Sequence, residues 1–490
     1  MSSFEKLGIN QSIIKALNLM GYEQPTKVQS EVIPVFKEGQ DILVKSQTGS
    51  GKTAAFGIPL VDMVEWEERA PQGLVLAPTR ELALQIQAEI FNLGRFKRMK
   101  VEAVFGRSSF EQQEKMLKQR THIVVATPGR LLDHVKRGTI DLSKIKYLVI
   151  DEADEMLDMG FVEQIEAVIK ALPNKHQTAL FSATMPDRIK ELVDRYLTVP
   201  KMIEVSSANQ VQKRIEQVYY NVLEDDKLQL LLDVIVVENP DTSIIFCNTR
   251  DAVEEVVDAL EQLGAKPEML HGGMEQRDRT KTINEFKQGY FRYLVATDVA
   301  ARGLDVTDVT LVVNFDLPDK VENYTHRIGR TARFENSGRA LVFVNQFDER
   351  RFSAIRESYS DIQQFMAPKE ELVISQMSSF SAKQNRQPEL KALKELVFKD
   401  EIMKLHINAG KKTKMRAGDV VGAICNIDGL SGDDIGVISL LDVSTFVEIL
   451  NGKGDKVLKE LQSMPIKGRM RRVNKANESQ YEKEMTNRNK

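Results

Sequence analysis

Short apolar runs alternate along most of the chain with longer segments in which apolar residues recur every three or four positions. A short apolar run is typical of a buried strand, and the longer spacing is typical of an amphipathic helix. Strands that alternate with helices predict a parallel sheet that is covered on both faces. In the first part of the chain we expect helices over 7–20 and from Arg80, and strands at 41–44, 73–77, 101–104, 122–126 and 147–150.

A second series of apolar runs follows a polar, glycine-poor connector at 206–213. It predicts strands at 243–247, 293–296, 309–314 and 339–344. The pattern divides this part of the chain into a first domain over 1–205 and a second domain over 214–360. The polar segment 361–400 then predicts a flexible connector with one short helix at 388–398.

The region 401–476 has a pattern of its own, and a polar tail, 477–490, follows it. We expect strands at 403–408, 436–441, 445–450 and 467–473, and helices at 417–427 and 456–464. The resulting β-α-β-β-α-β order is the architecture of RNA-recognition modules. The expected fold class is therefore α/β, with two tandem parallel-sheet domains followed by an α+β, RRM-like domain.

Length and composition fit this division. The 490 residues suggest about three domains at roughly 150 residues each. A net charge of -3 argues neither for nor against nucleic acid, because local patches decide that question. The two cysteines, Cys247 and Cys425, are too few for a zinc cluster and indicate a reducing compartment. No stretch approaches the roughly 20 apolar residues that span a bilayer, so we expect a cytoplasmic monomer with no membrane partner.

The segment after the first expected strand has the composition of a phosphate-binding loop. Its glycines let the backbone approach an anion, its lysine reaches the outer phosphates, and its threonine hydroxyl can bind Mg²⁺. A strand precedes it and a helical pattern follows, which is the context that such a loop requires. The loop consists of Ser46, Gln47, Thr48, Gly49, Ser50, Gly51, Lys52 and Thr53.

Four residues, Asp151 to Asp154, follow the strand expected at 147–150 and include three acids. Ligands of an open α/β sheet bind beyond the carboxyl ends of its strands, so this segment should face the phosphate loop. Asp151 is placed to hold Mg²⁺ through water, together with Thr53, and Glu152 to deprotonate the attacking water. A solvated acidic turn is the alternative, which the preceding strand and loop disfavour.

Several motifs, taken in order, resemble those of the DEAD-box RNA helicases. They are Pro25-Thr26 with Gln29, the phosphate loop, Pro78 to Leu82, Thr127 to Arg130, Asp151 to Asp154, and Ser182 to Thr184. The resemblance implies two RecA-like domains, with ATP and Mg²⁺ as cofactors. It also implies that Phe4 and Gln29 contact adenine and that Ser182 and Thr184 couple the nucleotide to RNA. Gly106-Arg107 departs from the Gly-Gly pair common in that family.

The second domain has no phosphate loop of its own but carries three arginines between His326 and Arg333. Their spacing fits an exposed basic helix. The resemblance implies instead that Arg330 and Arg333 reach the transferred phosphoryl group, joining Lys52 and Glu152 in catalysis, and that Asp305 faces the nucleotide. The family's RNA-contacting positions correspond to Arg80, Gly106, Thr127, Gly129, Arg130, Arg250, Gln276, Arg279 and Thr297.

The region 401–476 resembles the C-terminal domain of DbpA-type DEAD-box proteins, which implies that large-subunit ribosomal RNA is the partner. The usual stacking aromatics are missing, since His406 and Val447 occupy candidate positions and Phe446 is the only aromatic nearby. The expected contacts are Lys411, Lys412, Lys414, Arg416, Lys467 and Arg469. We therefore expect an ATP-dependent RNA helicase that opens short duplexes in large-subunit assembly. An ATP-gated RNA clamp and a DNA-directed motor are the alternatives.

Overall fold

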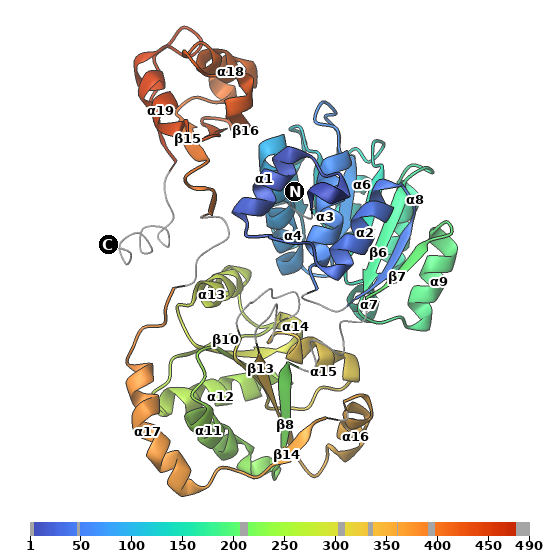
Figure 1. Cartoon of the computed structure of the whole chain (residues 1–490), viewed down its shortest axis with the longest axis vertical. Coiled ribbons are helices and arrows are strands. Elements are labelled where there is room, and N and C mark those ends of the chain that lie inside the picture. The colour runs from blue at the N-terminus through green and yellow to red at the C-terminus, as the bar shows by residue number, and fades with distance from the viewer. Residues whose placement is uncertain are drawn as a thin grey trace.

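The computed structural model describes residues 4–46, 50–205, 214–301, 309–331, 337–359, 361–390 and 397–476, with only the backbone of Val299. Two parallel seven-stranded sheets and one antiparallel four-stranded sheet form three domains (Figure 1). This confirms the expected fold class. Several expected site residues, namely Gln47, Thr48, Gly49, Asp305 and Arg333, and the connector 206–213, lie outside the described residues.

The first sheet has the strand order β3-β4-β2-β5-β6-β1-β7. Its strands are β1 (Ile42–Lys45), β2 (Gly73–Leu76), β3 (Val101–Val104), β4 (Ile123–Ala126), β5 (Tyr147–Ile150), β6 (Gln177–Ser182) and β7 (Lys201–Glu204). The five strands expected from the sequence are confirmed within one residue at each end. β6 and β7 were not expected, and three of the four residues of β7 are exposed at the sheet edge.

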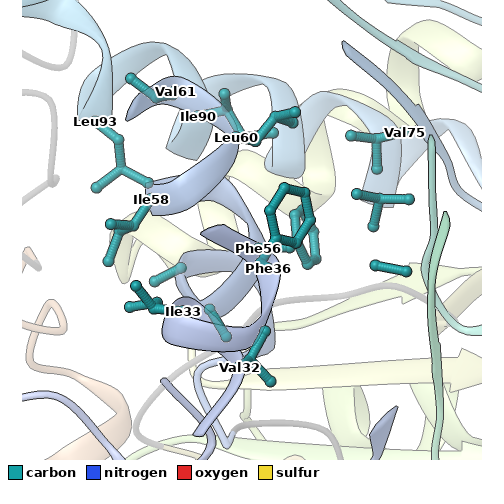
Figure 2. Close-up of a cluster of buried hydrophobic side chains, with 14 of the residues drawn as sticks. Val32, Ile33, Phe36, Phe56, Ile58, Leu60, Val61, Val75, Ile90 and Leu93 are labelled. Atoms are coloured by element: carbon teal, nitrogen blue, oxygen red, sulfur yellow. The ribbon is translucent and has the colours of Figure 1, made fainter. Parts of the chain in front are cut away.

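The helices of this domain cover both faces of the sheet. They are α1 (Gln11–Leu19), α2 (Lys27–Lys37), α3 (Lys52–Met63), α4 (Arg80–Leu93), α5 (Phe110–Leu117), α6 (Pro128–Lys136), α7 (Ala153–Asp158), α8 (Val162–Ala171) and α9 (Asp187–Tyr196). Figure 2 shows side chains of α2, α3 and α4 in one cluster with Val75 of β2. Its neighbours Leu74 and Leu76 belong to the cluster on the other face, as strand alternation requires.

The helix expected over 7–20 is shorter than the apolar pattern suggested. A short 3-10 helix, η1 (Glu5–Leu7), ends at Gly8, whose φ of 65° is left-handed. Asn10 then caps α1, because its side chain accepts the N–H of Ser12 at 2.9 Å. The glycine and the cap interrupt a pattern that periodicity alone reads as one helix.

The second sheet repeats the order of the first, as β10-β11-β9-β12-β13-β8-β14. Its strands are β8 (Ile215–Asn221), β9 (Ser243–Cys247), β10 (Pro267–Leu270), β11 (Tyr293–Thr297), β12 (Leu311–Asn314), β13 (Gly338–Val344) and β14 (Gln363–Phe365). Its helices are α11 (Lys227–Glu238), α12 (Arg250–Gln262), α13 (Gln276–Gln288), α14 (Asp298–Ala301), α15 (Val321–Ile328), α16 (Glu349–Ser358) and α17 (Glu370–Gln384). The four expected strands are confirmed, and β8, β10 and β14 were not expected.

The connector expected over 361–400 contains a long helix that the sequence did not predict, and most of the helix expected at 388–398 lies outside the described residues. α17 runs from Glu370 to Gln384 and packs on α11, with Phe380 fully buried in the second domain's core. Val373 and Met377 precede Phe380 at helical spacing and pack against the same cluster. The apolar signal was therefore present but diluted by the serines and glutamines around it.

The C-terminal domain has the expected β-α-β-β-α-β order, and its sheet order is β16-β17-β15-β18. Its elements are β15 (Met403–Ile407), α18 (Ala417–Cys425), β16 (Ile435–Leu440), β17 (Thr445–Ile449), α19 (Gly454–Ser463) and β18 (Val473–Lys475). The last strand was expected too early. Lys467 and Gly468 both have left-handed φ values, so residues 466–469 form a turn before the strand begins. Within the described ranges, no helix is long and apolar enough to cross a membrane.

Candidate nucleotide and RNA site

The phosphate loop joins β1 to α3 at the carboxyl edge of the first sheet. Ser46 and Ser50 flank the part of the loop that the structure does not describe, and their Oγ atoms lie 3.1 Å apart. Gly51 has a φ of 87°, and a Cβ there would lie 2.6 Å from Nε2 of Gln29. The backbone conformation and this close neighbour together explain the glycine.

Lys52 begins α3 with a buried side chain, which is only 7% exposed. Among the described residues its Nζ has no hydrogen-bond partner. Burying an ammonium group without a partner is costly, so the position fits an anion that binds from outside. The helix N-terminus adds positive potential at the same place. These groups fit the outer phosphates of ATP, and the hydroxyl of Thr53 and the carboxylate of Asp151 fit Mg²⁺.

Asp151 directly follows β5 and is 3% exposed. Burial raises the pKa of its carboxyl to about 7; the charge of Lys52 opposes this shift and that of Glu152 adds to it. The N–H of Glu152 donates to Oδ1 of Asp151 at 3.0 Å. Glu152 itself has a φ of 49°, a left-handed conformation that costs a non-glycine residue about 1 kcal/mol. The strain sits at the residue expected to be the catalytic base.

Asp154 links the acidic segment to the end of β6. Its Oδ2 accepts the N–H of Ala183 at 3.1 Å, the N–H of Thr184 at 2.8 Å and the hydroxyl of Thr184 at 2.9 Å. The hydroxyl of Ser182 donates to the carbonyl of Thr184 at 2.6 Å. The Asp151 to Asp154 segment is therefore not a solvated turn, because its two aspartates are buried and Oδ2 of Asp154 accepts three hydrogen bonds.

Gln29 connects the start of α2 to the phosphate loop. Its Oε1 accepts the N–H of Thr26 at 2.9 Å, and its Nε2 donates to the carbonyl of Gly51 at 3.2 Å. Thr26 also donates its hydroxyl to the carbonyl of Ser50 at 3.0 Å. Phe4 is 1% exposed and packs in the domain core. Contact of Gln29 and Phe4 with adenine stays a prediction.

Two ion pairs join α7, the helix that begins in the acidic segment, to α15 of the second domain and to the residue that precedes it. Nδ1 of His326 lies 2.5 Å from Oε1 of Glu155, and Lys320 lies 3.1 Å from Asp158. Burial by itself lowers the pKa of His326, but the hydrogen bond and the charge of Glu155 outweigh it, and the net pKa is raised. The helix that follows Glu152, the expected base, thus contacts the segment of the second domain that carries Arg330.

Arg330 lies in this contact and is 6% exposed. Its Nε donates to the carbonyl of His326 at 3.2 Å, and it lines a small cavity that Glu155 also lines. The segment is therefore not an exposed basic helix at this position. A catalytic role for Arg330 stays a prediction.

Arg327 was not identified from the sequence, although it is the largest fully buried side chain of the described residues. Its Nε and Nη2 pair with the two carboxylate oxygens of Asp298 at 2.6 and 2.7 Å. It also donates to Asn248 at 2.9 Å and to the carbonyl of Asp316 at 2.5 Å. Arg327 therefore fixes the loops after β9, β11 and β12 relative to the arginine segment. The basic motif contains three arginines, but the sequence does not indicate which of them has a structural role.

The RNA candidates of the first domain lie on the loops and first helical turns that follow the carboxyl ends of β2, β3 and β4, which are adjacent strands. They are Arg80, Gly106, Thr127, Gly129 and Arg130. Nη1 of Arg130 donates to the carbonyl of Ser108 at 3.0 Å, which ties two of these loops together. Arg107 has a φ of 56°, so it holds the left-handed conformation that glycine usually provides.

Two RNA candidates of the second domain contact the first domain beside one of these helices. Gln276 and Arg279 both contact Glu81 of α4, at 3.0 and 3.4 Å. This places them beside Arg80 across the domain boundary. Arg250 begins α12 after β9, and Thr297 ends β11.

The two basic segments of the C-terminal domain also meet. Nζ of Lys467 donates to the carbonyl of Lys414 at 2.5 Å and pairs with Asp419 at 2.9 Å. The structure thereby joins Lys411 to Arg416 with the turn that carries Arg469. His406 and Phe446 stack on each other with ring centroids 4.9 Å apart.

Comparison with known protein families divides the chain in the same way. Residues 26–192 match the DEAD/DEAH box helicase model, and residues 226–335 match the helicase conserved C-terminal domain. Residues 404–475 match the DbpA RNA binding domain.

Individual relatives agree with these matches. The chain is 52% identical over 479 residues to the ATP-dependent RNA helicase DbpA of Bacillus subtilis (strain 168), covering 97% of this chain and 100% of the relative. It is 42% identical to the DEAD-box ATP-dependent RNA helicase CshA of the same strain, over 73% of this chain and 72% of that protein. S. cerevisiae Dbp5 bound to RNA and ADP BeF3 has a similar structure, with a TM-score of 0.69, 30% identity, and coverage of 78% of this chain and 100% of that chain.

Proposed function

The chain belongs to the DEAD-box ATP-dependent RNA helicases of the DbpA type, and from that premise we propose that it opens short RNA duplexes during assembly of the large ribosomal subunit. As a member of this family it is an RNA helicase that hydrolyses ATP. The observation that carries the proposal is the contact network of the acidic segment and of Glu155, which follows it in α7. Asp154 binds the Ser182 to Thr184 segment, while Glu155 binds His326 of the second domain.

The chemistry follows from the groups around the phosphate loop. Lys52 neutralises charge on the outer phosphates, and Mg²⁺ held by Thr53 and Asp151 would supply further positive charge. Glu152 accepts a proton from water as the water oxygen bonds to the γ-phosphorus. The bond from that phosphorus to the bridging oxygen breaks, which leaves ADP and phosphate. Arg330 is proposed to stabilise the charge that develops during this step.

Closure of the two parallel-sheet domains couples this chemistry to RNA. ATP and RNA would each contact groups from both domains, so each should favour the closed arrangement. Linkage then requires that RNA tightens ATP binding and that ATP tightens RNA binding by the same factor. Loss of the γ-phosphate removes one bridge and lets the domains separate. We propose that the RNA candidates after β2, β3 and β4 lie at the edge of the first sheet that faces the second domain, so their distance from that domain changes when the domains close or separate.

The C-terminal domain is proposed to select the RNA. Its basic segment Lys411 to Arg416 contacts the turn that carries Arg469, and the cations of both are proposed to bind RNA phosphates in place of the missing aromatic platform. Tethering raises the local concentration of the helicase domains near duplexes beside the bound site. We further propose that the protein acts as a cytoplasmic monomer.

The test compares the full chain with a chain that ends at Leu390. This end keeps α17, whose Phe380 completes the core of the second domain. We expect both chains to hydrolyse ATP at saturating generic RNA, and only the full chain to be activated preferentially by a hairpin from large-subunit ribosomal RNA. A DNA hairpin of the same sequence is the control for an RNA requirement. Equal activation of both chains by ribosomal and unrelated hairpins would contradict the ribosomal role.

A further inference from the structure

The C-terminal domain packs directly on the first domain, far from the nucleotide. Phe398, Ile402 and Leu450 form a small buried cluster with Ala16 of α1. Phe96, in the 3-10 helix η2 (Arg95–Lys97), packs against this cluster, and its ring centroid lies 6.3 Å from that of Phe398. The contact is apolar at its centre, as a specific interface is.

Charged groups surround this apolar centre. Nη2 of Arg95 lies 3.0 Å from Oε1 of Glu448, and both side chains are largely buried. Arg98 donates to the carbonyl of Gly432 at 2.6 Å, just before β16. Lys15 pairs with Glu401 at 2.6 Å. These contacts fix one orientation of the C-terminal domain on the first domain.

A cavity of about 780 Å³ lies beside this contact, between the two domains. One wall consists of residues that precede β2, β3, β4 and β5, including Trp66, Arg69 and Arg120. The other wall includes the edge strand β16, the start of α18, and Lys411. The cavity therefore opens at the amino ends of the first sheet's strands, whereas the phosphate loop lies at their carboxyl ends.

The walls of the cavity carry an excess of positive charge. Arg69, Arg120 and Lys411 have no ion-pair partner among the described residues, and Asp141 is the only acidic residue among those that line the cavity. Lys100 is buried in the same wall and pairs with Glu102 at 3.4 Å; burial lowers its pKa, Glu102 opposes this shift, and the charge of Lys411 adds to it. Docking thus adds Lys411 to a wall that already carries Arg69 and Arg120, and an anion in the cavity would be attracted to all three.

Trp66 adds an aromatic surface to this cationic wall. It is 39% exposed and lines the cavity, and the guanidinium of Arg120 lies 4.2 Å from its ring centroid. Aromatic rings beside a cationic groove are what proteins use to bind single-stranded nucleic acid.

We propose that this interdomain cavity binds a single-stranded RNA segment that extends from RNA held by the C-terminal domain. The inference rests on the proposed RNA-binding role of that domain. Lys411 belongs both to the basic segment of the C-terminal domain and to the cavity wall, so one strand can contact both. Phosphates of the RNA segment neutralise Arg69 and Arg120, and one of its bases contacts the solvent-exposed part of the Trp66 ring. The strand would hold the C-terminal domain in its docked position.

Trp66 is the only tryptophan in the chain, so its fluorescence reports on this cavity alone. The probes are three forms of a large-subunit rRNA hairpin. One has a single-stranded oligouridine extension at its 5′ end, one has it at its 3′ end, and the blunt hairpin has no extension. We expect an extended hairpin to shield Trp66 from quenching by acrylamide and the blunt hairpin not to do so. Unchanged or greater quenching with both extended hairpins, once fluorescence anisotropy shows that they are bound, overturns the inference.

Charge reversal provides a second, independent measurement. The double variant Arg69→Glu/Arg120→Glu should weaken binding of the extended hairpin, and the slope of log K against log salt should fall by about 1.4 for two lost contacts to a single strand. Binding of the blunt hairpin should stay unchanged. Lys201→Glu is the matched control, since Lys201 is an exposed cation on the opposite edge of the same sheet.

These measurements separate the two proposals. Failure of the wild-type chain to bind the blunt hairpin or to hydrolyse ATP with RNA contradicts the proposed function. Wild-type binding of the extended hairpin by the double variant contradicts only the cavity. Thermal unfolding of the double variant at the wild-type midpoint shows that a loss of binding is not a loss of fold.

Discussion

The two parallel-sheet domains share one strand order and each has a buried lysine at the equivalent position. The lysines differ in whether they have partners within the domain. Lys52 begins the helix after β1, and Lys227 begins the helix after β8, the strand that occupies the equivalent place in the second sheet. Both side chains are buried. Among the described residues Nζ of Lys52 has no hydrogen-bond partner, whereas Lys227 lies 2.5 Å from Asp316 and 3.2 Å from Glu224.

The difference extends to the aspartates. Asp151 follows β5, and Asp316 follows β12, its counterpart in the second sheet. Burial raises the pKa of Asp151, while the bond to Asp316 outweighs burial and raises the pKa of Lys227. The second domain thus pairs its lysine internally, whereas the lysine of the first domain has no partner among the described residues, and we propose that it binds phosphate. One scaffold therefore serves as a nucleotide site or as a structural partner according to its loops.

The largest expected effect tests what the second domain supplies to the first. Arg330→Ala should lower ATP turnover by about 10³- to 10⁵-fold, because an arginine finger stabilises charge that develops during transfer. RNA-stimulated ATPase measures it, and a fluorescent ATP analogue measures binding. Arg188→Ala, an exposed arginine of the first domain, is the control. Turnover within a few-fold of wild type would leave Arg330 a structural residue.

A smaller loss is expected within the first domain itself. Glu152→Gln should lower turnover by about 10²- to 10⁴-fold while ATP and RNA stay bound, because the amide keeps the shape and loses the base. Single-turnover hydrolysis and RNA binding with ATP present are the measurements. A variant that failed to bind ATP would assign Glu152 to nucleotide binding instead.

The two lysines provide the most direct test of the comparison. Lys52→Ala should lower turnover by about 10²- to 10³-fold, as loss of one preorganised charge does, with no loss of stability. Lys227→Ala should lower the free energy of unfolding by about 1.5 to 3 kcal/mol, because it removes the buried lysine that bonds to the half-buried carboxylate of Asp316. Denaturant unfolding and ATPase, measured on both variants, separate these outcomes. Similar losses of stability in both variants would contradict the conclusion that Lys227 has an internal partner and Lys52 does not.

The smallest effect concerns pH and the contact between the domains. The pKa of His326 is raised in the folded protein, so its pairing with Glu155 contributes fully below the ordinary histidine pKa and is lost as pH rises through the raised value. Interdomain energy transfer between two dyes should report less closure above that pH. His326→Gln should remove the pH dependence, and an unchanged dependence would assign it to another group.

The sequence by itself determined the local features. The phosphate loop, the acidic segment and most of the central strands were predictable because residue type and spacing along a few neighbouring positions specify them. The short edge strands β7 and β14 were missed, since three-residue or exposed strands carry little apolar periodicity. α17 was missed because Phe380 is a single aromatic in a polar segment, and its burial depends on packing against α11.

Only the tertiary structure decided which charges meet. Lys227 and Asp316 are 89 positions apart, and Arg98 and Gly432 are 334 positions apart, so no local pattern relates them. Arg327 and Arg330 look alike in the sequence, yet only Arg327 shows a bidentate bond to Asp298. Periodicity indicates whether a side chain is buried. Its partner depends on strand order and domain docking, which are set by contacts between residues far apart in the chain.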